Sequence, residues 1–260
     1  MSGKGGQPFP PLPAFAGFPP QAPAFLQALR ENNATAWFQA HKEDYDVAVA
    51  QPLKALLDAL TPAMLMVDPD FETLPQRGAI ARIRRDVRFS RDKSPYRIHQ
   101  WLSFKPRTPA WATCPAFFFD FGPDDYCLGM GYYAATPATM TRVRAGIVAN
   151  TAAFAAAATA AQQADFTVEG PVFKRLPVAP HPLPAPAQAW FTRKTAYLLS
   201  RRSLDALFFS PELAEVVQAR FLAVAPLYAL LSEFSPRLWA TGKTEAENAE
   251  GGGAFVADSD

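Results

Sequence analysis

The fold is decided by the run FFFDF (117–121), the turn GPDD (122–125) and the run YCLGMGYY (126–133). Two β-prone runs that flank a short polar turn predict an antiparallel hairpin. If Gly122 pairs with Asp125, side chains alternate so that one face carries only large apolar groups. These are Phe117, Phe119, Phe121, Tyr126, Leu128 and Met130. This face predicts the hydrophobic core of a sheet.

The other face of the hairpin is mixed: it carries Phe118, Asp120, Cys127, Gly129, Gly131 and Tyr133. In the same register Cys127 faces Asp120, while Cys114 lies near the far end, so we expect neither a disulfide nor a metal site from the two cysteines. Gly129 and Gly131 leave this face without side chains at alternate positions, which lets another group approach closely. We favour a packed helix there over the floor of a ligand pocket.

The elements around the hairpin complete an α+β fold. Apolar spacing predicts helices before the hairpin, after it and near the C-terminus, where Ser210-Pro211-Glu212 begins the last one. The order of elements indicates a single domain with a mainly antiparallel sheet. We place this domain at residues 24–239, between a flexible segment rich in Pro and Gly (1–23) and a disordered tail (240–260).

Length and composition set the protein's class. The chain has 260 residues, of which 49% are hydrophobic, enough for one substantial core. We find no apolar run long enough to cross a bilayer and no secretory signal, so we expect a cytoplasmic protein. Two cysteines fit that compartment.

Charge is concentrated in residues 77–97, which we call the basic arm. Eight basic side chains stand there against two acidic ones, a local excess of six. Because the whole chain carries only +1, the remainder sums to about −5. One positive surface on a mildly acidic body indicates binding to an anion.

The arm also shows a structural pattern. Ile83, Val87 and Phe89 are all at odd-numbered positions, so in a strand their side chains would lie on the same face. This alternation predicts a strand with one buried face over residues 82–89. A second alternating run covers residues 99–105, so we expect a wide hairpin. Its loop, at residues 90–96, is the natural segment to face a ligand.

The candidate ligand-binding residues lie mainly in this arm. The guanidinium group of arginine and the ammonium group of lysine can bind phosphate and carboxylate oxygens. A neighbouring acidic side chain can hold these groups in position, and an aromatic ring can line one side of the binding site. His181, in a proline-rich loop, is added because histidine titrates near neutrality. The set is Arg82, Arg85, Asp86, Arg88, Asp92, Lys93, Tyr96 and His181. An internal salt-bridge network that braces the loop is an equally weighted alternative.

Other chemistry finds no support. There is no phosphate loop, no dinucleotide fingerprint and no other cofactor motif, and His41, His99 and His181 have no metal-ligand spacing. Asp86 and Asp92 are salt-bridge partners rather than an acid pair. No base or nucleophile stands out, so enzymatic activity is left open.

The expected partner is a small phosphorylated or carboxylated molecule. A pI of about 7.8 disfavours general nucleic-acid binding, and no membrane partner is expected. The alternative is a non-enzymatic binding or scaffold module for a protein or nucleic acid. The oligomeric state is open.

The charged stretch also resembles a known family. Residues 82–97 are similar to the Arg-Ile-Tyr-Arg-Asp-x-Arg-Phe-Ser-Lys-Asp-Lys-x-Pro-Tyr-Lys run of the domain of unknown function 2461 family, which comprises conserved hypothetical bacterial and fungal proteins. Weaker similarities extend the resemblance from Phe25 to Leu231. Arg84 departs from it by replacing an aromatic residue, and the segment before His181 is short and rich in proline. The resemblance implies no activity.

Overall fold

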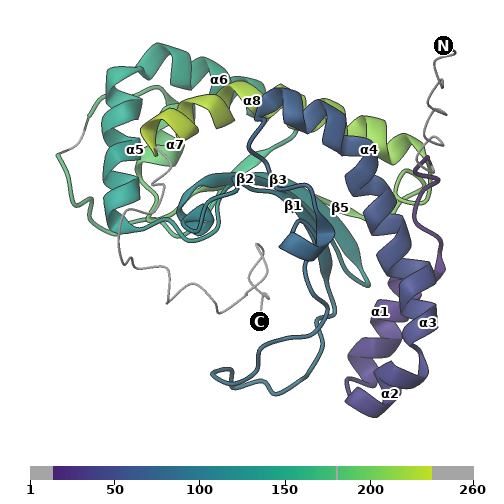
Figure 1. Ribbon diagram of the computed structural model, residues 1–260. Coiled ribbons are helices and arrows are strands. Elements are labelled where there is room, and N and C mark those ends of the chain that lie inside the picture. Colours follow the sequence, from purple (N-terminus) through teal and green to yellow (C-terminus); the bar gives the residue numbers. More distant parts are fainter. Residues whose placement is uncertain (1–13, 180, 236–260) are drawn as a thin grey trace, which may run out of the picture.

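The structure is a computed structural model that describes residues 14–179 and 181–235 (Figure 1). It confirms the predicted α+β class, with one antiparallel sheet of five strands in the order β1-β2-β3-β5-β4. The strands are β1 (Gln100–Phe104), β2 (Pro115–Phe121), β3 (Asp125–Tyr132), β4 (Thr167–Glu169) and β5 (Tyr197–Ser203). The α-helices are α1 (Gln21–Glu31), α2 (Thr35–Ala40), α3 (Lys42–Tyr45), α4 (Gln51–Val67), α5 (Pro137–Ala149), α6 (Thr151–Gln163), α7 (Ala185–Phe191) and α8 (Glu212–Phe234).

The segment that leads into α1 packs onto the domain. Phe15 and Phe18 are buried, and the ring of Phe18 stacks on that of Phe208 at 4.7 Å between centroids. The helix then begins at Gln21, within the segment expected at residues 1–23. Residues 1–13 of that segment, and the tail expected at residues 240–260, lie outside the described residues.

The central hairpin has the predicted register. Asp120 pairs with Cys127, Phe119 with Leu128, and the turn closes with a 2.9 Å hydrogen bond from the Gly122 amide to the Asp125 carbonyl. Both cysteines are free and buried. No helix packs at Gly129, contrary to the expectation, because the Leu198 carbonyl and the ring of Phe118 lie there, 2.2 Å and 2.4 Å from where a Cβ would stand.

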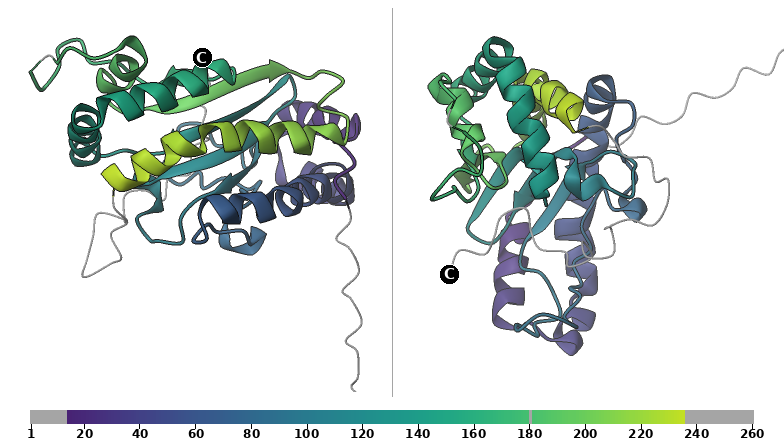
Figure 2. Two further views of the ribbon diagram at one scale, coloured as in Figure 1. Left: turned by 90° about the horizontal axis from the view of Figure 1, so that it is seen from above. Right: turned by 90° about the vertical axis from the view of Figure 1, so that its left-hand side faces the viewer.

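Helices cover one face of the sheet. The view from above in Figure 2 shows α4 and α8 lying across the strands, and α8 contacts β2 and β3 while α4 contacts β1. Their apolar stripes pack on the predicted core face, where the side chains of Phe117, Phe119 and Leu128 are fully buried. The opposite face is concave in Figure 1, and no α-helix of the described chain lies beneath it.

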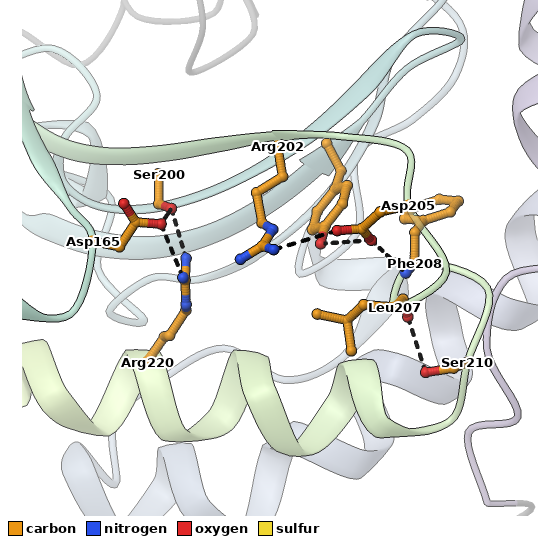
Figure 3. A network of polar contacts seen from close by, with 9 residues as sticks. Asp165, Ser200, Arg202, Asp205, Leu207, Phe208, Ser210 and Arg220 are labelled. Carbon is orange, nitrogen blue, oxygen red and sulfur yellow. Dashed lines mark hydrogen bonds and ion pairs between the residues drawn. The ribbon is translucent and has the colours of Figure 1, made fainter.

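Helix α8 is apolar because it belongs to this core. By length and composition alone it could cross a membrane, which the sequence-based expectation did not foresee, but Leu213, Val217 and Phe221 are buried in the domain. A polar network also ties the helix to the sheet (Figure 3). Arg220 donates hydrogen bonds to Ser200 at 2.6 Å and to Asp165 at 3.0 Å.

The basic arm leaves the sheet beside β1 and extends below it in Figure 1. The chain folds back as a hairpin, but in a different register from the expected one. The Arg85 amide donates to the Pro95 carbonyl at 2.9 Å and the Arg97 amide donates to the Ile83 carbonyl at 2.8 Å, whereas the run at 99–105 pairs with residues 79–81. The predicted strand at residues 82–89 is wrong, because only isolated bridges form and Phe89 is 94% exposed. The arm passes beyond the sheet, so no second layer is available to bury that ring.

Candidate functional site

Tyr96 anchors the basic arm to the helical layer. It is 3% exposed and stacks on Phe38 of α2, with 4.2 Å between ring centroids. The Asn33 side chain accepts from the Tyr96 amide at 3.0 Å and donates to its carbonyl at 2.9 Å. Tyr96 therefore holds the base of the arm in place, and its ring faces the core rather than a ligand.

The two acidic residues of the arm each hold one arginine. Arg88 donates through Nη2 to Asp86 at 2.6 Å, and Arg85 forms a short ion pair with Asp92. The hydrogen bonds from Arg88 lower the pKa of Asp86 to about 2. Hydrogen bonds from Ser94, followed by that from Arg85, lower the pKa of Asp92 to about 2. Both acids thus stay ionised at neutral pH.

The other cations of the arm are less constrained. Lys93 donates to the Val87 carbonyl at 2.9 Å, which bends the tip of the arm. Arg82, Arg84 and Arg91 are exposed, and within the described chain none of them forms an ion pair. The two acids match only two of the eight basic groups, so the arm keeps its excess of six positive charges.

His181 lies away from this cluster. It is exposed in the loop before α7, a helix that contacts α5 and α6, whereas the arm adjoins β1 at the other edge of the sheet. Among the described residues His181 makes no hydrogen bond or ion pair with the arm. His181 therefore lies apart from the candidate residues of the arm, and among these the Tyr96 ring faces the core.

A second polar cluster lies on the concave face of the sheet. Nδ1 of His99 is 2.8 Å from Oδ1 of Asp120, and the imidazole lies over Gly122, where a Cβ would stand 2.5 Å from the ring. Any larger residue at Gly122 would displace the imidazole from this position. Asp120 is nearly fully buried, and burial raises its pKa, while the hydrogen bond and charge of His99 act in the opposite direction.

Charged and aromatic groups surround this pair. Trp101 on β1 pairs with Asp120, and the guanidinium of Arg97, the last basic residue of the arm, lies over the Trp101 ring at 4.9 Å. On the other side, Cys127 pairs with Arg201 of β5. Arg97 thus links the arm to the concave face.

Sequence reasoning missed the pair of His99 and Asp120. Two sequence features could have indicated the pair. His99 and Trp101 lie on the same face of the predicted strand at 99–105, and Asp120 was already assigned to the face that carries Cys127. Joining them required the register between β1 and β2, in which Gln100 pairs with Phe121. That register depends on tertiary pairing rather than on a local turn.

The described residues hold no group of three or more His, Cys, Asp or Glu side chains placed to bind a metal ion. A family model described as "Conserved hypothetical protein (DUF2461)" matches residues 21–229, a span that includes the arm and the concave face. This match confirms the resemblance seen in the charged stretch. No curated protein matches the chain.

Proposed function

The chain belongs to the DUF2461 family of conserved hypothetical proteins, and we propose that it binds an anionic ligand through the basic arm. The observation that carries this proposal is the unbalanced charge of the arm. Asp86 and Asp92 each fix one arginine, while Arg82, Arg84 and Arg91 remain exposed and without an acidic partner in the described chain. An internal salt-bridge network would need about as many acids as bases; this arm has two acids for eight bases.

The ligand class follows from the chemistry of these side chains. Guanidinium groups bind phosphate and carboxylate oxygens through paired hydrogen bonds, so a phosphorylated or carboxylated molecule is the expected ligand. Arg85 and Arg88 are already oriented by their acids, which reduces the entropy lost on binding. The anchor at Tyr96 fixes the base of the arm relative to the sheet.

A second candidate ligand is single-stranded nucleic acid, and one observation favours it. Phe89 at the tip of the arm is 94% exposed, with the Arg88 guanidinium 5.7 Å from its ring centroid. An exposed aromatic ring beside arginines is the arrangement on which bases stack while phosphates are neutralised. A small-anion site does not require such a ring.

The test compares two variants of equal charge. One carries Arg82→Gln, Arg84→Gln and Arg91→Gln, which leave both ion pairs of the arm intact. The control carries Lys42→Gln, Lys174→Gln and Arg175→Gln, which remove three exposed charges outside the arm. Thermal shift and binding are measured with a nucleotide, a sugar phosphate, a dicarboxylate and short single-stranded DNA. We expect at least one probe to stabilise the wild type and the control but not the arm variant.

Salt dependence separates the two ligand classes. For DNA, removing three phosphate contacts should reduce the slope of log affinity against log salt by about 2, and Phe89→Ala should weaken binding. For a small anion the slope stays shallow and Phe89→Ala has no effect. Equal losses in the arm variant and the control, or no response of the wild type to any probe, would contradict a binding role for the arm.

A further inference from the structure

The pair of His99 and Asp120 has the geometry of a proton-transfer site. When Asp120 is ionised it can only accept a hydrogen bond, and the 2.8 Å contact with Oδ1 then places a proton on Nδ1 of His99. Nε2 is then the nitrogen left to accept a proton. The His99 side chain is 26% exposed and that of Asp120 is 3% exposed, so the imidazole lies outward and the carboxylate behind it.

A purely structural acid in this protein is bonded differently. Asp68 is also buried, and each of its oxygens has a partner: Oδ1 accepts from the Asp70 amide at 3.0 Å, and Oδ2 accepts from the Tyr228 hydroxyl at 2.5 Å. In Asp120, by contrast, Oδ2 is buried and has no hydrogen-bond partner among the residues that the structure describes. A buried acid with one unsatisfied oxygen is costly for stability and requires another explanation.

The groups that face the pair come from each neighbouring strand. On β3, Cys127 is directly opposite Asp120, and burial raises the pKa of its thiol, which therefore stays protonated and is a poor nucleophile. Asp125, also on β3, is ion-paired at 2.5 Å with Arg201 of β5. The Arg97 guanidinium lies over Trp101 of β1. Among the described groups around Asp120, the imidazole of His99 is the one with a nitrogen able to take up a proton.

These neighbours also indicate the substrate. Arg97 and Arg201 place guanidinium groups on both sides of Asp120 in the cross-strand row that runs through Trp101 and Cys127. We propose that His99 and Asp120 form a proton-transfer site for a small phosphorylated or carboxylated molecule held by Arg97 and Arg201. This site goes beyond anion binding at Arg82, Arg84 and Arg91, and it shares with the arm only Arg97.

The chemical step is a reversible proton transfer. Nε2 of neutral His99 takes the proton of a substrate hydroxyl or of a water molecule; the O–H bond breaks, its electron pair stays on oxygen, and an N–H bond forms. The negative charge of Asp120 stabilises the resulting imidazolium. Nε2 later returns this proton to the oxygen of the bound molecule. His99 and Asp120 therefore end in the protonation state in which they began.

The test is NMR of the full chain labelled with ¹⁵N in its histidines, assigned with His99→Gln. His41 and His181 serve as internal references. We expect His99 to carry a proton on Nδ1 and its pKa to fall by about one unit or more in Asp120→Asn, because an adjacent negative charge is removed. The references should not move, and circular dichroism checks that the variant is folded.

Anion binding is then measured through the ¹⁵N signals of the His99 ring, as a change in the pKa of His99. Inorganic phosphate and succinate should raise the pKa of His99 in the wild type, since a bound anion favours the imidazolium. Arg97→Gln and Arg201→Gln should each reduce this effect, whereas the arm variant with Arg82, Arg84 and Arg91 replaced should retain it. Loss of the effect in the arm variant alone would assign the anion to the arm instead.

Two results would overturn the proposal. One is a wild-type His99 whose titration is unchanged by both anions; this measurement needs no variant to fold. The other is a folded Asp120→Asn protein in which the pKa of His99 has not moved. Failure of the arm to bind any probe would leave both of these readouts intact, so the two proposals are tested separately.

Discussion

At the scale of single residues, Asp86 and Arg88 show how the arm holds a guanidinium in place. Asp86 accepts from both the side chain and the backbone amide of Arg88, and these bonds lower its pKa from 3.8 to about 2. Because the folded-state pKa is below the ordinary value, the ionised pair stabilises the arm above about pH 4. That contribution is lost as the pH falls towards 2. Arg88 is 70% exposed, so the effect is local.

Arg88→Gln should therefore raise the pKa of Asp86 part of the way back to 3.8. The return is partial because the variant keeps the backbone amide that donates to Oδ1 at 3.1 Å. Carboxyl ¹³C NMR over the acidic range measures this directly, and Asp92, which is held by Ser94 and Arg85, is the internal control. An unchanged pKa of Asp86 would show that the Arg88 side chain does not engage it in solution.

At the scale of elements, the arm depends on one anchor outside itself. The Asn33 side chain makes two hydrogen bonds with the Tyr96 backbone, and the Tyr96 ring stacks on Phe38. The pairing within the arm consists of isolated bridges, such as that between Arg84 and Tyr96, which are weak without a third strand. The order of the arm should therefore follow the integrity of this anchor.

Asn33→Ala should loosen the arm and leave the sheet intact. It removes two hydrogen bonds worth about 1 kcal/mol each, so amide exchange in the arm should accelerate by roughly one order of magnitude or more. The amides to follow are those of Arg85 and Arg97, which are bonded across the arm, with the Phe119 amide in β2 as the reference. Equal acceleration at all three would mean that Asn33 supports the whole domain rather than the arm.

Sequence patterns predicted an element well where its partners are close along the chain. The turn at residues 122–125 and the alternation on both sides fixed the register of β2 and β3, including the pairing of Asp120 with Cys127. The same alternation at 82–89 led to a wrong strand, because parity alone does not show whether a second layer is present to bury Phe89. The run at 99–105 does pair with the arm, but through residues 79–81 rather than through the predicted strand.

The candidate site was predicted only in part, for a related reason. Its charged residues are neighbours along the chain, so the cluster in the arm was visible in the sequence. The role of Tyr96 was not, since it is set by Phe38 and Asn33, some sixty residues earlier. His99 and Asp120 likewise meet only through the pairing of β1 with β2.

At the scale of the whole molecule, one core joins the helical layer to the sheet. The ring of Phe117 on β2 lies 5.2 Å from that of Phe221 and 5.1 Å from that of Tyr228, both on α8. It also contacts Phe71, from the loop after α4, at 5.9 Å. Because these contacts connect α8 and the loop after α4 to β2, the layers should unfold together.

Two phenylalanines therefore provide a matched comparison. Phe117→Ala leaves a cavity at the centre of the core and should lower the free energy of unfolding by about 3–5 kcal/mol. Phe89→Ala removes a ring that is 94% exposed and should change it by less than about 0.5 kcal/mol. Urea denaturation followed by far- and near-ultraviolet circular dichroism measures both, and the two signals should change in one transition.

If Phe89→Ala cost as much as Phe117→Ala, the arm would be part of the core in solution, and its exposed charges could not serve as a free binding surface. If the two signals separated in Phe117→Ala, the sheet and its helices would be independent units rather than one domain.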